Sequence, residues 1–445
     1  MSGAKPVRFL NILQEFSIPL LVGVAVALLA ANLANDAYQA ALHWMPFGHV
    51  SLLGHEITLH FLVNDVFMVF FFAIAAKEVT EGCLPGGSLN PVRKAINPLL
   101  ATVGGVVAPV AVFFLGVWIL FEVGVYSLEV DDWFVISRGW GVPTATDIAL
   151  AWLVARTIFG KGHPAINFLL LLAVADDAIG LVIIAVFYGD PELPTRPEFL
   201  GLILVGMAAT YALRRVGVRS WLPYVLAGGP LAWCGLVLAH LHPALAMVFI
   251  VPFMPGPRRD TGLFAGLDEV DEMGEVLASD YQIEHSTLDR FEHHLKGFVD
   301  FGLFFFAFVN AGVPLAQVGP MTWVILASLV VGKTLGVTLF SLVAIRLGFP
   351  LPDRMGLPEL VMAGFVAALG LTVALFVASA AFTDPLLLGQ VKMGALFSGF
   401  VGLVAIGLGR MLGFGRRADQ TAVADRAGTR SVSPQARPSD ELSGS

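Results

Sequence analysis

The chain has 445 residues, of which 57% are apolar and only 13% are charged, whereas a soluble domain carries about 25% charged residues. Apolar runs of about 20 residues recur along its whole length, which predicts an all-α polytopic membrane protein and disfavours a β-barrel of alternating segments of about 10 residues. The net charge is −8, the two cysteines make no disulfide or zinc framework, and the basic residues are spread over loops, so a nucleic-acid footprint is excluded.

Hydropathy predicts about twelve apolar spans. Their starts lie near Ile12, Phe61, Pro98, Val142, Ile166, Phe199, Trp221, Pro243, Phe298, Thr322, Leu360 and Leu387. The N-terminal sequence MSGAKPVRFL is not followed by the small-residue cleavage site of a signal peptide, so the first apolar run is interpreted as a true span. The seventh and eighth spans are separated only by HLHP at 240–243.

The short loops differ in their content of Lys and Arg, which predicts the orientation of the chain. One set of loops carries nearly all of these residues, while the opposite set carries only Arg138 and Arg196, with Lys392 near the end of a span. This asymmetry predicts an even number of spans with both termini in the cytoplasm.

The chain divides into a cytoplasmic N-terminal segment, a transmembrane domain and a tail, at residues 1–11, 12–413 and 414–445. Within the transmembrane domain, residues 43–60 contain short alternating runs around glycine, which favours a small external hairpin. Residues 257–297 are predicted to form an acidic cytoplasmic loop that contains LDEVDEMGE. The tail lacks hydrophobic periodicity, which is typical of disorder.

Charged residues lie at both ends of the second span, where Asp65 is near the beginning and Glu78 near the end. Both positions are close to the membrane interfaces, so neither requires a special role. In the fourth span, GVPTATDIALA places Pro143 and two threonines directly before Asp147. Such a sequence can open a membrane helix where protein shields the freed backbone, as in ion sites of transporters. The alternative is an ordinary helix start with Thr146 or Asp147 as the N-cap.

The fifth span contains two adjacent carboxylates, Asp176 and Asp177, in the apolar run FLLLLAVADDAIGLVIIAVF. A charge at mid-membrane costs at least about 2.5–3.5 kcal/mol, and like charges favour keeping one carboxyl protonated. Neighbouring helix positions point about 100° apart, so the two side chains are expected to face different partners. The pair predicts a cation or proton site; a structural ion pair or an early end of the span is the alternative.

Further polar residues interrupt the later spans. Lys333 lies far from either end of its apolar run and needs a counter-charge, for which Asp176 or Asp177 is the candidate. Gly370 and Thr372 interrupt the eleventh span, where glycine-mediated helix packing is the alternative explanation.

The entrance to the ninth span, RFEHHLKGF, could form a pH-responsive cluster of Glu292, His293 and His294, or simply be a solvated helix entrance. A zinc-protease motif is absent because HEITLH is one residue too long, and no GxGD motif or phosphate-binding loop occurs. A cation channel, a membrane-embedded hydrolase and a symporter of an organic anion stay open as rivals.

Seven stretches together resemble the NhaA-type sodium/proton antiporters. They occur in the family's order between about residues 10 and 413, as NDVFMVFFF, NPLLATVGGVVAP, GVPTATDIALA, AVADDAIG, FAFVNAGV, GKTLG and LTVALFVASAAF. The resemblance implies twelve helices, with helices 3–5 and 10–12 as inverted repeats and with helices 4 and 11 unwound and crossing at mid-membrane.

The resemblance also implies the function: electrogenic, pH-regulated export of Na⁺ or Li⁺ in exchange for protons, two per sodium. The protein would be no enzyme and would need no cofactor. Its partners would be sodium ions, protons, membrane lipid and a second copy of the chain in a homodimer. It would lie in the cell inner membrane. Another proton- or sodium-coupled transporter with the same helix breaks is the alternative.

Carried over by motif, Asp177 is similar to the principal cation ligand, and Asp176 to the aspartate that works beside it and pairs with Lys333. Thr146 and Asp147 match the unwound part of helix 4, where the aspartate balances the helix ends. The oxygens of Asp177, Asp176 and Thr146 would hold Na⁺, since carboxylates suit hard cations.

Asn310 and Gly370 match further motif positions, and we expect them to support the site together with Thr372 and Asp65. The family's pH-response residues correspond to a separate group, which comprises Glu78, Glu292 and His293.

The sequence departs from the family pattern in three places. A basic residue often stands three positions after Glu78, but here Glu81 does, with Lys77 before Glu78 instead. The second histidine of the cytoplasmic helix entrance is replaced by Lys296, and the proline after the intramembrane lysine by Thr334. These departures alter the expected pH-sensing residues and leave the core motifs intact.

Overall fold

The structure is a computed structural model that describes residues 17–84, 92–127, 131–160, 162–189, 193–256, 286–352 and 354–414. The expected N-terminal segment 1–11, the tail from 415 and most of the acidic loop lie outside these ranges.

The helices and strands of the first half run from α2 to α9. They are α2 (Ile18–Leu33), α3 (Asn35–Leu42), β1 (Ser51–Leu52), β2 (His55–Glu56), α4 (Leu59–Phe61), η1 (Leu62–Phe67), α5 (Met68–Cys83), α6 (Val92–Glu122), α7 (Trp133–Ser137), η2 (Arg138–Thr144), α8 (Ile148–Phe159) and α9 (Pro164–Phe187). The second half consists of η3 (Pro197–Phe199), α10 (Leu200–Val216), α11 (Leu222–Leu238), η4 (Pro243–Phe249), η5 (Val251–Phe253), α13 (Thr287–Asn310), η6 (Leu315–Gln317), α14 (Pro320–Ala327), η7 (Ser328–Lys333), α15 (Thr334–Arg346), α16 (Leu357–Val366), α17 (Leu371–Ala381) and α18 (Pro385–Leu412).

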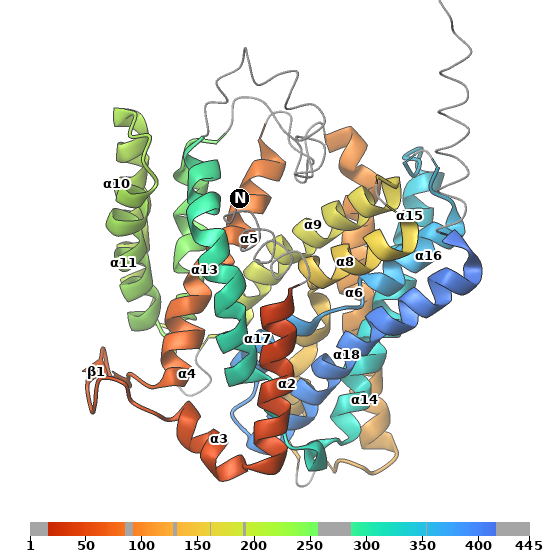
Figure 1. Ribbon diagram of the computed structural model, residues 1–445, viewed down its shortest axis with the longest axis horizontal. Coiled ribbons are helices and arrows are strands. Elements are labelled where there is room, and N and C mark those ends of the chain that lie inside the picture. The colour runs from red at the N-terminus through yellow and green to blue at the C-terminus, as the bar shows by residue number, and fades with distance from the viewer. Residues whose placement is uncertain are drawn as a thin grey trace, which may run out of the picture.

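Helices dominate this bundle, and strands β1 and β2 form one small antiparallel hairpin within residues 43–60 (Figure 1). By length and composition, six helical stretches of the described chain could cross a membrane, or eight if each of two bent helix pairs is one span. The chain is therefore a multi-pass helical membrane protein.

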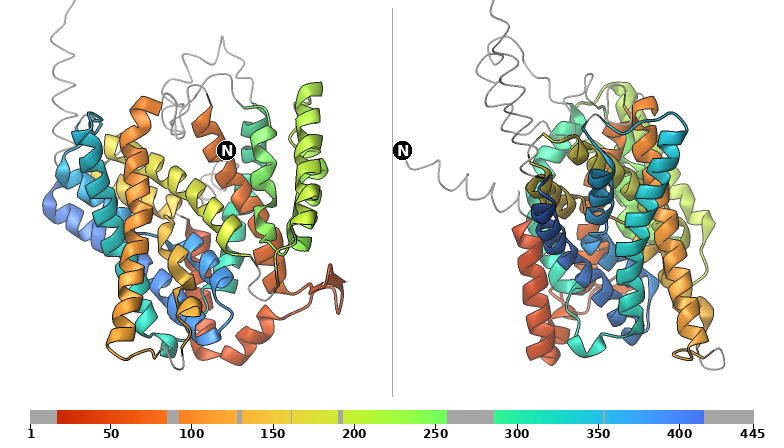
Figure 2. Two further views of the ribbon diagram at one scale, coloured as in Figure 1. Left: turned by 180° about the vertical axis from the view of Figure 1, so that it is seen from behind. Right: turned by 90° about the vertical axis from the view of Figure 1, so that its right-hand side faces the viewer.

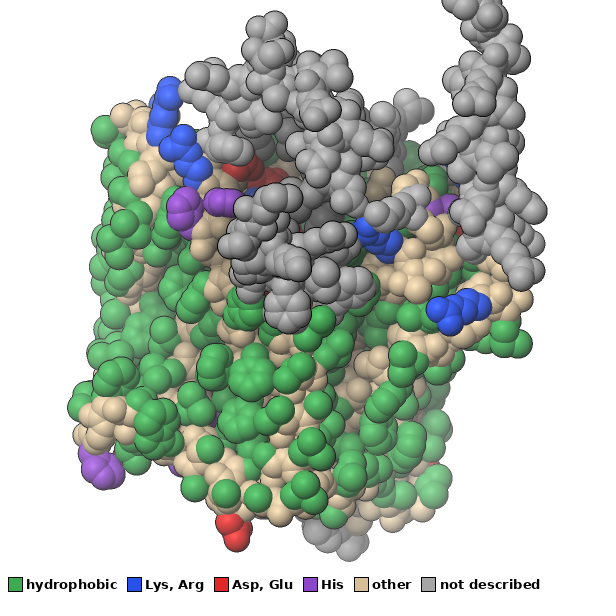
Figure 3. All heavy atoms as spheres, in the orientation of Figure 1, with side chains coloured by type: hydrophobic (Ala, Val, Ile, Leu, Met, Phe, Trp, Pro, Cys, Tyr) green, Lys and Arg blue, Asp and Glu red, His purple; other side chains and the backbone are tan. Residues whose placement is uncertain are grey.

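Lys and Arg side chains gather at one end of the molecule, and hydrophobic side chains cover the broad surface below them (Figure 3). We call this the basic end; it includes Arg214 and Arg215 at the last turn of α10 and Arg346 at the last turn of α15. The hydrophobic surface contains strongly exposed residues such as Leu204 and Val205 of α10, which lipid would cover in a membrane.

Two helices are broken in the middle of the bundle. The pair α7–η2 and α8 bends by 47°, and so does the pair α16 and α17. The first break follows Pro143, which ends helical hydrogen bonding, and the second falls at Gly370. The two breaks lie against each other, since the backbone N–H of Asp147 donates to the carbonyl of Leu369 at 2.6 Å.

Close backbone contact joins α6 and α15, which run side by side along one edge of the molecule (Figure 2). Gly104 and Gly336 face each other there so closely that a Cβ atom on either would overlap the other's carbonyl. Small residues allow this approach in membrane helices. At the opposite edge, α10 and α11 form a peripheral hairpin (Figure 1).

Several expected boundaries differ from the structure; the fourth span, for example, begins at Trp133 of α7 and not near Val142. The ninth helix begins at Thr287, not near Phe298, because Ser286 and Asp289 form a capping box that starts it in polar sequence. The last part of the expected loop 257–297 is therefore helical. The expected eighth span consists of two short 3₁₀ turns, η4 and η5. Pro243 is the first residue of η4 and Pro252 the second residue of η5, and both prolines interrupt regular α-helical bonding.

Candidate ion site

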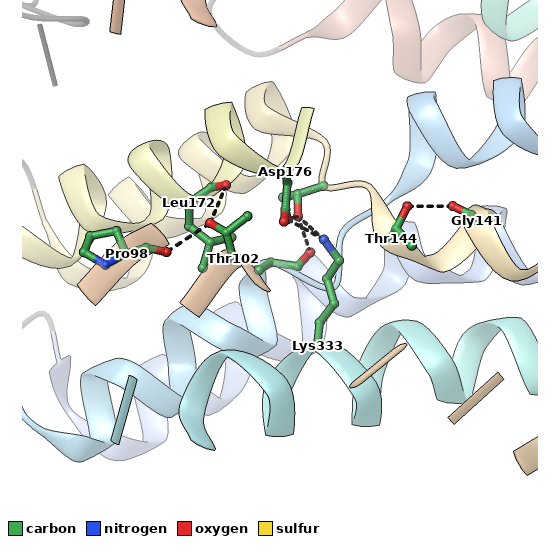
Figure 4. Close-up of polar contacts among 9 residues, drawn as sticks. Pro98, Thr102, Gly141, Thr144, Leu172, Asp176 and Lys333 are labelled. Atoms are coloured by element: carbon green, nitrogen blue, oxygen red, sulfur yellow. Dashed lines mark hydrogen bonds and ion pairs between the residues drawn. The ribbon is translucent and has the colours of Figure 1, made fainter. Parts of the chain in front are cut away.

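The centre of the candidate site is a buried ion pair between α9 and the end of η7. Lys333 Nζ donates to Asp176 Oδ2 and to Thr146 Oγ1, both at 2.6 Å (Figure 4). Thr146 Oγ1 lies 2.7 Å from the same carboxylate oxygen and 2.9 Å from the carbonyl of Ala367, so its single proton faces two acceptors. Asp176 is 1% exposed and Lys333 and Thr146 are 0% exposed, so protein groups alone surround the pair.

Local structure brings these side chains together. Lys333 is the last residue of η7, a π-helical turn whose extra residue redirects the side chains that follow; such turns are frequent at functional sites. Thr102 of α6 lies against α9 with its hydroxyl 3.0 Å from the carbonyl of Pro98 and 3.3 Å from that of Leu172 (Figure 4). This contact holds α9 one turn before Asp176.

Asp177 points into a different, apolar environment, as the 100° helical offset predicts. Its side chain lines a small apolar pocket together with Phe72, Ala75, Leu181, Ile184 and Val373. The Oδ1 atoms of Asp176 and Asp177 are both buried and have no hydrogen-bond partner within the described chain. Two neighbouring carboxylates thus each keep one free oxygen in the interior of a membrane protein.

Asp147 joins the two broken helices. Its Oδ1 accepts from the backbone N–H of Leu150 at 3.1 Å, and its Oδ2 accepts from the N–H and the hydroxyl of Thr372 at 3.3 and 2.9 Å. The carboxylate therefore caps the N-termini of both α8 and α17, where partial positive charges gather. The expected N-cap and the expected helix break are both present at this position.

Gly370 lies at the crossing of the breaks. A Cβ atom there would be 3.0 Å from a methyl of Leu329 and 3.2 Å from the carbonyl of Ala145. Its N–H donates to the hydroxyl of Ser398 at 3.2 Å. The absence of a side chain thus permits the close approach.

Asn310 and Asp65 do not contact the ion pair. Asn310 instead exchanges hydrogen bonds with Asn64 and accepts one from the hydroxyl of Ser379 at 3.0 Å. Asp65 lies in η1, and its carbonyl accepts from the indole of Trp233 at 2.8 Å. Its carboxylate bonds to none of the residues that the structure describes.

The expected pH-response residues lie towards the basic end. Lys77 forms ion pairs with Glu292 and, at 2.7 Å, with Glu81, and Lys296 lies 3.5 Å from Glu292. This cluster connects α5 with α13. His293 is exposed on α13, and it forms no ion pair with the residues that the structure describes.

Sequence reasoning missed the roles of Lys77 and Thr102. Lys77 is buried to 95% although it lies near the end of an apolar run, and its pairing with Glu292 depends on two helices far apart in sequence. Thr102 could have been noticed as a lone hydroxyl within the apolar motif NPLLATVGG.

Comparison with known proteins places the chain among transporters. A family model described as Na+/H+ antiporter 1 matches residues 8–409. The "Na(+)/H(+) antiporter NhaA" of Geobacter sulfurreducens is 56% identical over 403 residues, which cover 91% of this chain and 97% of that protein. The protein of the same name from Desulfitobacterium hafniense is 52% identical over 416 residues, 93% of this chain and 99% of that protein. A solved sodium proton antiporter, MjNhaP1 from Methanocaldococcus jannaschii, is similar with a TM-score of 0.49 and 12% identity, over 93% of this chain and 98% of that one.

Proposed function

The chain belongs to the Na+/H+ antiporter 1 family, and on this premise we propose that it exchanges Na⁺ for protons across the membrane that it spans. The observation that carries the proposal is the pair of free, buried Oδ1 atoms on Asp176 and Asp177. A buried carboxylate needs either a proton or a cation to compensate the loss of water. Two such groups side by side can bind one or the other.

Competition for these carboxylates is the proposed mechanism. Ionised Asp177 and Asp176, with Thr146 Oγ1, offer oxygens to Na⁺, which is a hard cation. Protonation neutralises the carboxyls and releases the ion. In either case only a neutralised site crosses the apolar barrier at low cost, so the two ions move in opposite directions.

Lys333 takes part through its ion pair with Asp176. Cation binding to Asp176 weakens the attraction that holds the Lys333 ammonium in place, and loss of a proton from Lys333 would compensate. In this way the lysine can carry a proton in the cycle. Two protons per sodium would make the exchange electrogenic, and Li⁺, also a hard cation, is included as a substrate.

The proposed architecture has twelve helices with two inverted repeats. Its support in the structure is the equal bend of 47° at two broken helices whose breaks meet. We further propose that the basic end faces the cytoplasm, with both termini on that side, in the cell inner membrane. The same proposal includes domain boundaries at residues 11 and 413 and an external loop at 43–60. It also includes a cytoplasmic loop that begins at residue 257 and ends before α13.

Regulation by pH and a homodimer complete the proposed function. The ion pairs of Lys77 with Glu81 and Glu292 add a charged contact between α5 and α13, and this contact depends on protonation. Glu78 and His293 are the other proposed members. The hairpin of β1 and β2 is the proposed dimer contact.

The experiment uses everted membrane vesicles and a pH-sensitive dye, with Na⁺, Li⁺ and K⁺ added in turn across a pH series. We expect Na⁺ to release protons from wild-type vesicles and Asp177→Asn to abolish the signal at normal protein levels. Asp36→Asn, which changes an exposed aspartate of α3, should be active. Full activity of Asp177→Asn, or cation current without proton movement, as in a channel, would contradict the proposal.

A further inference from the structure

One tyrosine ties the far end of α9 to the first half of the broken helix. Tyr188 directly follows α9 and is 2% exposed. Its hydroxyl accepts from the N–H of Gly141 at 2.8 Å and donates to the carbonyl of Arg138 at 2.7 Å, both in η2. Burial raises the pKa of Tyr188, so the hydroxyl keeps the proton that it donates.

A second bond in the opposite direction reinforces this junction. The guanidinium of Arg138 donates to the carbonyl of Gly189 at 3.2 Å. The junction is also closely fitted, because a Cβ atom on Gly141 would lie 2.6 Å from the hydroxyl of Tyr188. The ring of Trp140 packs against those of Phe187 and Tyr188, at 5.1 and 6.2 Å between centroids. The two segments therefore have little freedom to slide.

α9 also contacts the segment that directly follows η2, at the ion site. Tyr188 lies twelve residues after Asp176, about 18 Å along a helix at 1.5 Å per residue. η2 runs from Gly141 to its end at Thr144. Thr146 follows two residues later in the extended segment before α8, and its hydroxyl is 2.7 Å from Asp176. Between these contacts Thr144 Oγ1 donates to the carbonyl of Gly141 at 2.7 Å, which keeps this stretch tightly wound (Figure 4). The junction at Tyr188 thus fixes one end of a frame whose other end is the Thr146–Asp176 contact.

We propose that Tyr188 is a positioning residue of the ion site: its hydroxyl fixes η2 against α9 and thereby sets the spacing of Thr146 from Asp176 and Asp177. This inference rests on the proposed function. A fixed spacing of oxygen ligands favours one cation size, because a rigid site cannot contract around a smaller ion. Loosening the frame should weaken Na⁺ binding and weaken Li⁺ binding less.

The test is Tyr188→Phe, which removes the hydroxyl and keeps the ring. Supporting residues of metal sites typically change affinity by about 10-fold or more, so we expect the KM for Na⁺ to rise by about 10-fold. The KM for Li⁺ should rise less, and the maximal rate per folded protein should stay within about 2-fold. Arg138→Gln, which removes only the bond to Gly189, should shift both KM values in the same directions by smaller factors.

Two other tyrosines give matched controls. Tyr224→Phe removes a buried hydroxyl that donates to the carbonyl of Val218 at 2.9 Å in the peripheral hairpin. Tyr126→Phe removes a buried hydroxyl that has no partner in the described structure. Both should keep the wild-type ratio of the Na⁺ and Li⁺ KM values, even where thermal stability falls.

A binding measurement separates this inference from the proposed function. Na⁺-dependent thermal stabilisation of the purified full chain reports cation binding without transport. If wild-type vesicles show no Na⁺-driven proton movement, the proposed function fails. Suppose instead that wild type transports, but Tyr188→Phe and Arg138→Gln keep the wild-type ratio of the Na⁺ and Li⁺ KM values and the wild-type stabilisation by Na⁺. The proposed role of Tyr188 is then overturned. It is also overturned if Tyr224→Phe changes this ratio and this stabilisation as much as Tyr188→Phe does. If Tyr188→Phe does not fold, the KM values of Arg138→Gln for Na⁺ and Li⁺ decide whether the inference holds.

Discussion

Lys333 Nζ lies 2.6 Å from Asp176 Oδ2, and neither side chain is exposed beyond 1%. The lysine does not reach Asp177, although the two aspartates are neighbours. One carboxylate therefore begins with a cationic partner and the other without one. In the proposed function, we therefore expect Asp177 to bind the transported cation more directly than Asp176, which already has Lys333 as its partner.

Removal of Lys333 should destabilise the protein strongly. Lys333→Ala leaves Asp176 ionised without its partner, and breaking a buried pair costs about 3–5 kcal/mol. The double variant Lys333→Ala with Asp176→Asn removes both charges and should recover much of the loss. Melting temperatures of the purified proteins measure the effect. A double variant no more stable than Lys333→Ala would show that the ion pair does not cause the loss.

Gly370→Ala should impair the crossing of the broken helices. The new methyl group would press on Leu329 and on the carbonyl of Ala145, at 3.0 and 3.2 Å, and overpacking typically costs about 1–3 kcal/mol. We expect a lower melting temperature and a lower transport rate. Gly399→Ala on α18, where nothing lies within 4 Å of the new atom, is the matched control. Equal behaviour of the two variants would refute the steric argument.

Glu292→Gln should move the pH profile of transport without ending it. The change removes the charge that holds Lys77 of α5 to α13 and also affects Lys296. Loss of an opposite charge at such distances changes the pKa of neighbouring ionisable groups by about 1 or more. Dye dequenching across a pH series measures the profile, with Glu56→Gln in the exposed hairpin as control. An unchanged profile would leave Glu292 a structural residue only.

His163 predicts a pH dependence of stability. Its Nδ1 accepts from the N–H of Ala165 at 3.2 Å and caps α9, and burial lowers the pKa of His163 below its ordinary value. The neutral ring therefore stabilises the fold fully above the unfolded-state pKa of about 6.5. That stability is lost as the pH falls through the lower folded-state pKa, up to about 1 kcal/mol for a cap.

Replacement of the ring by a non-titrating cap tests this expectation. His163→Asn keeps a side-chain acceptor, so its melting temperature should fall less steeply than that of wild type below about pH 6.5. His49→Asn, at an exposed position, should follow wild type. Parallel curves for wild type and His163→Asn would show that the ring is not the titrating group.

The charged side chains of the site could be predicted from the sequence because a charge inside a membrane span costs free energy. Asp176, Asp177 and Lys333 stand out in apolar runs, and the helical offset correctly predicts different surroundings for the two aspartates. Hydropathy and spacing left open which aspartate meets Lys333, because the approach of α9 to η7 depends on the whole bundle. The family resemblance implied Asp176, which is the partner in the structure.

Other features depend on contacts that the sequence does not display. The sequence favoured a broken helix at Asp147 and left an N-cap as the alternative. Only the contact with Thr372 shows that this carboxylate caps two helices. Hydropathy did not reveal that α13 begins at Thr287, because it measures apolar content only. The first turns of this helix are polar, and a capping box starts them. The partners of Tyr188 lie some fifty residues away in the chain.

The glycine contact between α6 and α15 restricts how the molecule can rearrange. Because Gly104 and Gly336 meet backbone to backbone, these helices cannot shear past each other without a collision. Lys333, which directly precedes α15, and Thr102, on α6, are therefore expected to move together with these two helices. In the proposed exchange, any change in access to the carboxylates of α9 would therefore have to leave the packing of α6 against α15 intact.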